Sequence, residues 1–194
     1  MPRPREHNTE EVREATYRCF WENGFSHTSL ADLRQSTGLE PRQFLRDYGN
    51  KQGVFKQALH DFSVAAAHHT LARLERGQAG ISDIRESLGV LVGIDGKEGS
   101  WGCLICNTSQ DKEAMADEEV AAVVQAYFIR IEKAYRKALS RAVRDGEIVA
   151  DSQRQRRLAR SLMSTHVAIM MLKRSGKHDS VLRDIVYQAL AAVN

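Results

Sequence analysis

Prolines, cysteines and aromatic residues are scarce in this sequence. Its 194 residues include three prolines and three cysteines, and 7% of them are aromatic. So few prolines leave room for long helices, and an odd, small number of cysteines excludes a disulfide scaffold. No uncharged apolar run approaches the roughly 20 residues that span a bilayer, and the N-terminus lacks the apolar segment of a signal peptide. We therefore expect a cytoplasmic protein without a membrane segment and with reduced thiols.

The chain also lacks a strong excess of charge of one sign. Its net charge is +3, and residues 1–60 contain nine Arg and Lys against eight Asp and Glu, a difference of +1. Bulk charge therefore gives no argument for a nucleic-acid partner, and the placement of individual cations must decide. Arg3 and Arg5 lie in a short arm over residues 1–7, which is either a solvated tail or a segment that reaches into a DNA groove.

Apolar residues recur at helical spacing almost throughout the chain, and strand patterns are few, so the sequence predicts an all-α protein. A long helix from Lys51 to about Arg76 is expected to join an N-terminal domain, residues 1–50, to a larger helical domain, residues 51–194. The further helices are expected over about residues 8–23, 84–92, 117–145, 153–174 and 181–190, the first of them capped by Asn8.

Residues 24–55 have the pattern of two short helices joined by a tight turn. Ser29 is suited to cap the first helix, with Asp32 near its positive end. Gly38 is expected to end that helix, and Pro41 suits the first position of the next one. A helix, a glycine-containing turn and a short helix make a helix-turn-helix, whose second helix enters the major groove of DNA.

The same stretch resembles the DNA-binding region of the TetR (tetracycline repressor-like) transcriptional regulators. The residues that carry the resemblance are Gly24, Phe25, Thr28, Ser29, Gly38, Leu39, Phe44, Tyr48, Gly49, Lys51 and Phe55. The resemblance implies a three-helix DNA-binding domain with its helix-turn-helix at about residues 28–48, followed by a helical domain for ligand binding and dimerisation. It also implies a double-stranded DNA operator as partner.

Four departures from the pattern of this family affect the assignment of DNA contacts more than the fold. Leu45 stands where the family usually has a phosphate-contacting tyrosine, and Gln52 stands where it usually has glutamate. Arg34 replaces a small residue, and Glu40-Pro41-Arg42 replaces the usual Ser-x-Gly before the second helix.

Candidate DNA contacts follow from the position of each polar side chain. Arg42 and Gln43 begin the second helix and are the candidates for base edges, since Arg pairs with guanine and Gln with adenine. The candidates for phosphate contacts, which fix the register on DNA, are Thr28, Ser29, Arg46, Tyr48 and Lys51.

A ligand pocket between the later helices is the second expectation. Its candidate residues are Phe62, Trp101, Cys103, Cys106, Asn107, Tyr127, Met163, His166 and Met170. Residues 102–107, GCLICN, resemble the GCLLVN opening of a helix that, in a subset of TetR regulators, touches both the inducer pocket and the DNA-binding domain. Core packing remains the alternative for the aromatic residues, the methionines and His166. Cys103 and Cys106 either pack as buried thiols or sense an oxidant or electrophile.

The last two predicted helices carry more apolar surface than one subunit needs. We expect them to form a two-fold dimer through a four-helix bundle, as the resemblance also implies. The candidate interface residues are Leu162, Ile169, Val181, Leu182, Ile185, Val186, Ala189 and Leu190.

The sequence therefore predicts a homodimeric transcriptional repressor that leaves a pseudo-palindromic operator when it receives a small-molecule, oxidant or electrophile signal. Two alternatives remain: a cytosolic thiol-redox protein that uses Cys103 and Cys106, and a helical ligand-binding protein without DNA. No phosphate loop, zinc-ligand cluster or catalytic triad is visible, so we expect no enzyme, no metal and no cofactor.

Overall fold

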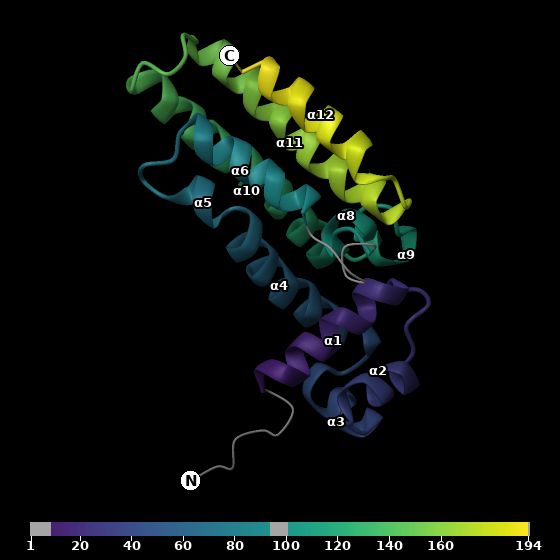
Figure 1. The fold of residues 1–194 in the computed structure, drawn as a ribbon. Helices are drawn as coiled ribbons and strands as arrows, with labels where there is room; N and C mark the ends of the chain where they lie inside the picture. Colours follow the sequence, from purple (N-terminus) through teal and green to yellow (C-terminus); the bar gives the residue numbers. More distant parts are fainter. Residues whose placement is uncertain (1–8, 94–100, 194) are drawn as a thin grey trace. The chain divides into compact units, whose positions relative to one another are not determined.

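The computed structural model describes residues 9–93 and 101–193, and in these ranges it contains helices and no strands, so the all-α prediction is confirmed. The Arg3 and Arg5 arm and the predicted cap Asn8 lie outside the described residues. The helices, coloured along the chain in Figure 1, are α1 (Glu10–Asn23), α2 (Leu30–Thr37), α3 (Pro41–Tyr48), α4 (Lys51–Thr70), α5 (Ala72–Glu75), α6 (Ile81–Val92), α8 (Leu104–Thr108), α9 (Lys112–Met115), α10 (Glu118–Arg144), α11 (Ser152–Arg174) and α12 (Asp179–Ala191).

The chain divides by packing into two compact units. The N-terminal unit comprises Met1–Ala65 with Cys103–Val124, and the C-terminal unit comprises Ala66–Gly102 with Gln125–Asn194. The N-terminal unit thus extends beyond residues 1–50, because it includes most of α4 together with α8, α9 and the start of α10. The functional boundary expected at Lys51 stays a prediction.

Aromatic residues form the core of the N-terminal unit. The ring centroids of Phe20 and Phe55 are 5.0 Å apart, and those of Phe25 and Phe55 are 4.8 Å apart. Leu33 of α2 and Phe44 of α3 are buried in the same unit. Each such side chain contributes about 1.5–3 kcal/mol when it leaves water, so the core fixes the short helices that are too short to be stable alone.

Helix ends in the N-terminal unit follow the expected capping chemistry. Ser29 accepts a hydrogen bond from the amide of Asp32, and the Asp32 carboxylate accepts one from the amide of Ser29 over 2.7 Å. Gly38 adopts the left-handed conformation at φ 73° and ends α2, as predicted. At the start of α1 it is Thr9 whose side chain accepts a hydrogen bond, from the amide of Val12.

The long helix expected over residues 51–76 is broken at Leu71, so this prediction was wrong in part. The Thr70 hydroxyl donates to the carbonyl of Ala66, and such bonds bend helices. The Thr70 carbonyl accepts from the hydroxyl of Ser87 over 2.9 Å. Because that carbonyl is held by a side chain from α6, the regular backbone pattern stops there and the short α5 follows.

Helix α6 is the centre of the C-terminal unit and packs against α5, α11 and α12. Figure 1 shows α11 and α12 side by side. Ile84, Leu88 and Leu91 of α6 are fully buried. Lys173 of α11 donates from Nζ to the carbonyl of Val92 over 2.6 Å, which satisfies the negative end of α6.

A polar pair lies inside the C-terminal unit. The hydroxyl of Tyr135 on α10 is 3.4 Å from Nδ1 of His166 on α11, and both side chains are buried. Burial lowers the pKa of His166 to about 4 and raises the pKa of Tyr135. His166 is therefore neutral at neutral pH, and its hydrogen bond to Tyr135 supports the interpretation of a core histidine.

Three of the predicted dimer-interface residues are covered by their own subunit. Leu162, Ile169 and Leu182 are at most 1% exposed. The helical pattern identified an apolar face correctly, but it could not show that α6 of the same subunit packs against α11 and α12. Of the other candidates Val181 is exposed, and Ile185, Val186, Ala189 and Leu190 are half-buried.

Candidate nucleic-acid interface

The turn between α2 and α3 sets the direction of the second helix. Gly38 takes the left-handed conformation that reverses the chain after α2. Arg34 of α2 then pairs over 2.9 Å with Glu40, the residue that precedes α3. Both side chains are about half exposed, so this ion pair orients the turn more than it stabilises it.

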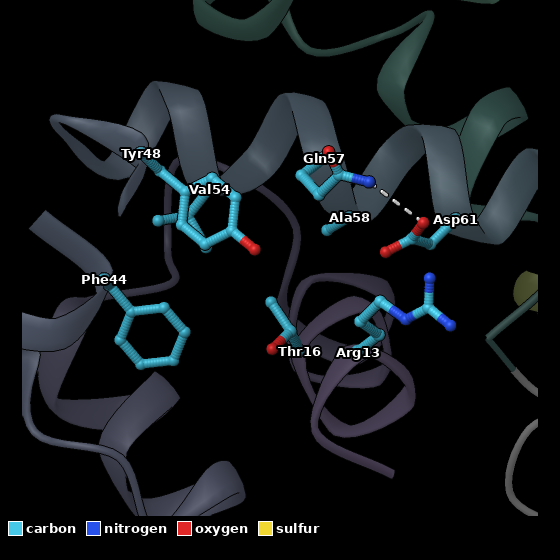
Figure 2. Close-up of a pocket in the computed structure, with 8 residues that line it drawn as sticks. All are labelled: Arg13, Thr16, Phe44, Tyr48, Val54, Gln57, Ala58 and Asp61. Carbon is cyan, nitrogen blue, oxygen red and sulfur yellow. Dashed lines mark hydrogen bonds between the residues drawn. The ribbon is translucent and has the colours of Figure 1, made fainter. Parts of the chain in front are cut away.

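The inner face of α3 is held by packing. Phe44 is 2% exposed, and with Tyr48 it lines a small cavity together with Thr16 of α1 and Val54 of α4 (Figure 2). The cavity measures about 10 Å³, which is room for about one water molecule. This face therefore serves the core of the unit, and the predicted phosphate contact of Tyr48 stays a prediction.

The opposite face of α3 is exposed. Arg42, Leu45, Arg46 and Gly49 are exposed and occur at positions i, i+3, i+4 and i+7, so they form one stripe along the helix and its end. We call these four residues the outer stripe. The side chain of Arg42 makes no hydrogen bond or ion pair with other described residues, whereas Nε of Arg46 lies 3.2 Å from the carboxylate of Asp47.

The side chain of Gln43 caps the start of α3, a role that the sequence analysis did not assign to it. Its Oε1 accepts a hydrogen bond from the backbone amide of Glu40 over 2.7 Å, at the N-terminus of α3. A glutamine that reads adenine needs both its oxygen and its nitrogen for the two bonds. Reading by Gln43 would therefore break a cap of the same helix, and Arg42 is the stronger candidate for base contacts. A Gln or Glu at the third position of a helix often caps the amide of the residue before the helix, so the sequence contained a signal for this role.

The two residues predicted to contact phosphate at the start of α2, Thr28 and Ser29, differ in exposure. Ser29 is exposed, and its hydroxyl donates to Asp32 over 2.6 Å. Thr28 is 2% exposed, and its hydroxyl donates to the carbonyl of Gly24 over 2.7 Å. Thr28 thus holds the turn before α2, and we leave it out of the proposed DNA contacts.

Lys51 begins α4 and is tied to the turn after α1. Its Nζ donates to the carbonyl of Phe25 over 3.0 Å and lies 4.2 Å from the centroid of the Phe25 ring. An ammonium group carries three donors, so one bond to a carbonyl leaves two directions in which a phosphate could be bound. The position at a helix N-terminus favours an anion there.

Residues far along the chain complete the N-terminal unit. Helix α8 packs against α1, and the hydroxyl of Ser26 donates to the carboxylate of Asp111, which also caps α9. Lys56 of α4 pairs with Asp117 over 3.4 Å and with Glu119 over 3.1 Å. The bond to Glu119 raises the pKa of Lys56, and the backbone amide of Val120 lowers the pKa of Asp117. Sequence reasoning found none of these pairs, because their members are about 60 or more positions apart.

The nine candidate pocket residues are divided between the two units. Phe62, Cys103, Cys106 and Asn107 belong to the N-terminal unit, whereas Trp101, Tyr127, Met163, His166 and Met170 belong to the C-terminal unit. Phe62 packs edge-on against Tyr17 and Trp21 of α1 at centroid distances of 5.8 and 4.9 Å, so it belongs to a core. The cavity of Figure 2 is lined by other residues, and the ligand pocket stays a prediction.

The two thiols near the start of α8 are close to each other and buried. Cys103 and Cys106 are 4% and 1% exposed. A hydrogen bond between the thiols and burial raise the pKa of Cys106. Because the thiolate is the reactive form, this environment favours packing over rapid reaction with an oxidant. Cys19, the third cysteine, is also buried, and burial raises the pKa of its thiol.

Among the described residues, no three His, Cys, Asp or Glu side chains lie together in a way that could hold a metal ion. None of the described helices is both long and apolar enough to cross a membrane.

Comparison with known proteins finds similarity over part of the sequence and over nearly the whole fold. The sequence matches no protein-family model. A stretch of 57 residues is 32% identical to the HTH-type transcriptional repressor ComR of Escherichia coli (strain K12). This stretch makes up 29% of this chain and 27% of that protein. The chain thus matches about a quarter of the length of this curated relative.

Solved structures match over nearly the whole chain. A cysteine mutant of the TetR family transcriptional regulator CifR, in complex with 26-base-pair operator DNA, has a TM-score of 0.83 at 22% identity, covering 98% of this chain and 99% of that one. A TetR family regulator from Cytophaga hutchinsonii has a TM-score of 0.80 at 16% identity, covering 97% and 94%. One from Chloroflexus aurantiacus has a TM-score of 0.75 at 21% identity, covering 95% and 94%.

Proposed function

We propose that this chain, which has the fold of the TetR family transcriptional regulators, binds operator DNA and represses transcription. The observation that carries the proposal is the outer stripe: the second helix of a helix-turn-helix presents Arg42 and Arg46 to solvent while Phe44 holds it in the core. An exposed, cationic second helix is what major-groove recognition requires.

The contacts divide into base reading and phosphate binding. Arg42, at the start of α3, is the proposed reader of a base edge, and guanine is the base that a guanidinium binds through two hydrogen bonds. Ser29, Arg46, Tyr48 and Lys51 are proposed to contact phosphates and to fix the register. Gln43 contributes by capping the helix that carries Arg42.

A dimer is the proposed assembly. The surface of α11 and α12 contains a groove lined by Ser161, Thr165, Val181, Asp184, Ile185, Gln188, Ala189 and Ala192. Four of these lining residues, Val181, Ile185, Ala189 and Ala192, are apolar, and Val181 is 43% exposed. A second copy that covers this groove would form a four-helix bundle with two-fold symmetry. Two outer stripes would then read two related half-sites of a pseudo-palindromic operator.

Release of the operator is proposed to follow a signal received outside residues 1–50, in a small-molecule site of the domain over residues 51–194 or at Cys103 and Cys106. The signal must favour one of two arrangements, because a ligand that binds both states equally shifts nothing. We further infer a cytoplasmic location and no enzymatic activity.

Two alternatives make different predictions. A thiol-redox protein would depend on Cys103 and Cys106, and the burial of both thiols disfavours this role. A helical ligand-binding protein without DNA would lose nothing when Arg42 is replaced, because that side chain lies outside the core.

Replacement of Arg42 tests the proposal. We expect Arg42→Ala to weaken specific binding by about 1–3 kcal/mol and to relax one base preference. Lys51→Ala is expected to weaken binding to all sequences alike. It should also reduce the slope of the logarithm of the binding constant against the logarithm of salt concentration by about one. Fluorescence anisotropy with a duplex from the region upstream of the gene and with a scrambled duplex measures both effects.

Arg85→Ala is the matched control, because Arg85 is an exposed arginine of α6 in the other unit and its loss should leave binding unchanged. Wild-type binding that is equal on specific and scrambled duplexes, or an Arg42→Ala variant that binds as well as the wild type, would contradict the proposal.

A further inference from the structure

We propose that Leu45 reads the C5-methyl group of a thymine in each operator half-site, so that the substrate of the outer stripe is a duplex with a thymine at a fixed place beside the base read by Arg42. This inference rests on the proposed function. It concerns a residue for which the resemblance to TetR regulators gives no role, because Leu45 replaces the tyrosine that usually contacts phosphate.

The Leu45 side chain lies on the exposed face of α3. Leu45 is 41% exposed, whereas Phe44, its neighbour on α3, is 2% exposed. It lies three residues after Arg42 and one before Arg46, on the same outer stripe. Residues three apart on a helix have Cβ atoms about 5–6 Å apart, so a groove that receives Arg42 also receives Leu45.

The chemistry of the Leu45 side chain favours contact with a methyl group. Leucine has no donor or acceptor, so Leu45 cannot replace the hydrogen bond that a tyrosine gives to a phosphate. On the major-groove edge of DNA the apolar group is the C5-methyl group of thymine. The other bases present donors and acceptors there, which a leucine would remove from water without replacing their hydrogen bonds.

Leu45 differs from an ordinary exposed leucine in its surroundings. Single apolar residues are common on protein surfaces and need no special explanation. Leu45, however, lies between two arginines on the face of the helix that would touch DNA, and a groove that closes over this face takes the side chain out of water. Removal of one methyl group from such a contact lowers affinity about fourfold.

Uracil substitution in the duplex isolates this methyl group. A site is first selected from random duplexes with the wild-type protein, and each thymine is then replaced in turn by uracil, which lacks only the methyl group. We expect one position per half-site where uracil weakens wild-type binding about fourfold. Leu45→Ala should bind the thymine and uracil duplexes equally at that position, while uracil at every other position affects both proteins alike.

Two matched variants complete the test. Leu45→Met keeps an apolar side chain of similar volume and should keep the discrimination against uracil. Val64→Ala, which alters an exposed residue of α4 away from the outer stripe, should also keep it. Cytosine at the same position should weaken binding, and 5-methylcytosine should recover part of the loss because it restores the methyl group.

Two results would overturn the inference in different ways. If a specific site is selected but every thymine-to-uracil change affects wild type and Leu45→Ala by the same factor, Leu45 reads no methyl group although the proposed function stands. If random duplexes yield no enriched site, the proposed function fails, and the inference fails with it.

Discussion

At the scale of single residues, Gln43 shows that one side chain can suit two roles that spacing alone does not separate. The sequence places a glutamine in the first turn of α3, where adenine recognition and helix capping are both possible. The structure shows Gln43 Oε1 bonded to the amide of Glu40, while the Glu40 carboxylate is paired with Arg34. The ion pair joins residues six apart across a turn, which a helical pattern does not encode.

Buried His166 gives a pH dependence of stability. Its pKa is about 4 in the folded chain, below the ordinary value near 6.5 that it takes when unfolded. Between these values the unfolded chain binds more protons, so the free energy of unfolding falls as the pH drops from about 6.5 towards 4. This contribution is on the order of 3 kcal/mol and is fully present above pH 6.5.

Urea unfolding at several pH values between 4.5 and 7.5 measures this effect. His166→Asn should flatten the pH dependence in this window. Tyr135→Phe removes the neighbouring hydroxyl but keeps the buried histidine, so its slope should remain that of the wild type, at a lower overall stability. A His166→Asn slope as steep as that of the wild type would contradict the assignment.

At the scale of elements, the sequence predicted most helices. It did not predict a helix break that depends on a side chain from another helix. Ser29, Asp32 and Gly38 act within one turn of the chain, and their caps appear as expected. The break at Leu71 depends on Ser87, which is 17 positions from the carbonyl that it binds. Local capping is therefore readable from a single sequence, whereas a side chain that arrives from another helix is not.

Gly53 controls the approach of α4 to the end of α3. A Cβ atom at this position would lie 2.0 Å from the carbonyl oxygen of Tyr48, so any side chain must displace the turn that ends α3. We expect Gly53→Ala to destabilise the protein by about 1–3 kcal/mol and to weaken DNA binding through the displaced outer stripe.

Gly89→Ala is the control for this change. Gly89 is an exposed residue inside α6, and a Cβ atom there would meet nothing within 4 Å. Because alanine favours helix more than glycine does, this variant should gain about 0.5–1 kcal/mol. Denaturant unfolding with far-UV circular dichroism compares the two. A Gly53→Ala variant as stable as the wild type would show that the turn tolerates the side chain.

At the scale of the whole molecule, the sequence indicated a dimer but could not separate the face used inside the subunit from the face left outside. Leu182 and Ile185 lie on the same helix three positions apart, yet Leu182 is fully buried by its own chain while Ile185 lines the groove of α11 and α12. Both have apolar side chains, so composition gives no distinction. The packing of α6 against α12 decides it.

Ile185→Glu tests the proposed dimer. A charge in the groove would be buried without a partner by a second copy, so we expect a monomer and loss of tight binding to the full operator. Analytical ultracentrifugation measures the mass. Val149→Glu, at a position 89% exposed and outside the groove, is the control and should leave the mass unchanged. An Ile185→Glu variant with the mass of the wild type would place the interface elsewhere.

Selection from random duplexes with the purified wild-type protein is the decisive test of sequence-specific DNA binding. We expect an enriched site with two related half-sites whose centres are about one helical turn apart, and binding to it that falls with added salt and with Arg42→Ala. Weak binding that is equal on all duplexes, with no enriched sequence, would contradict it.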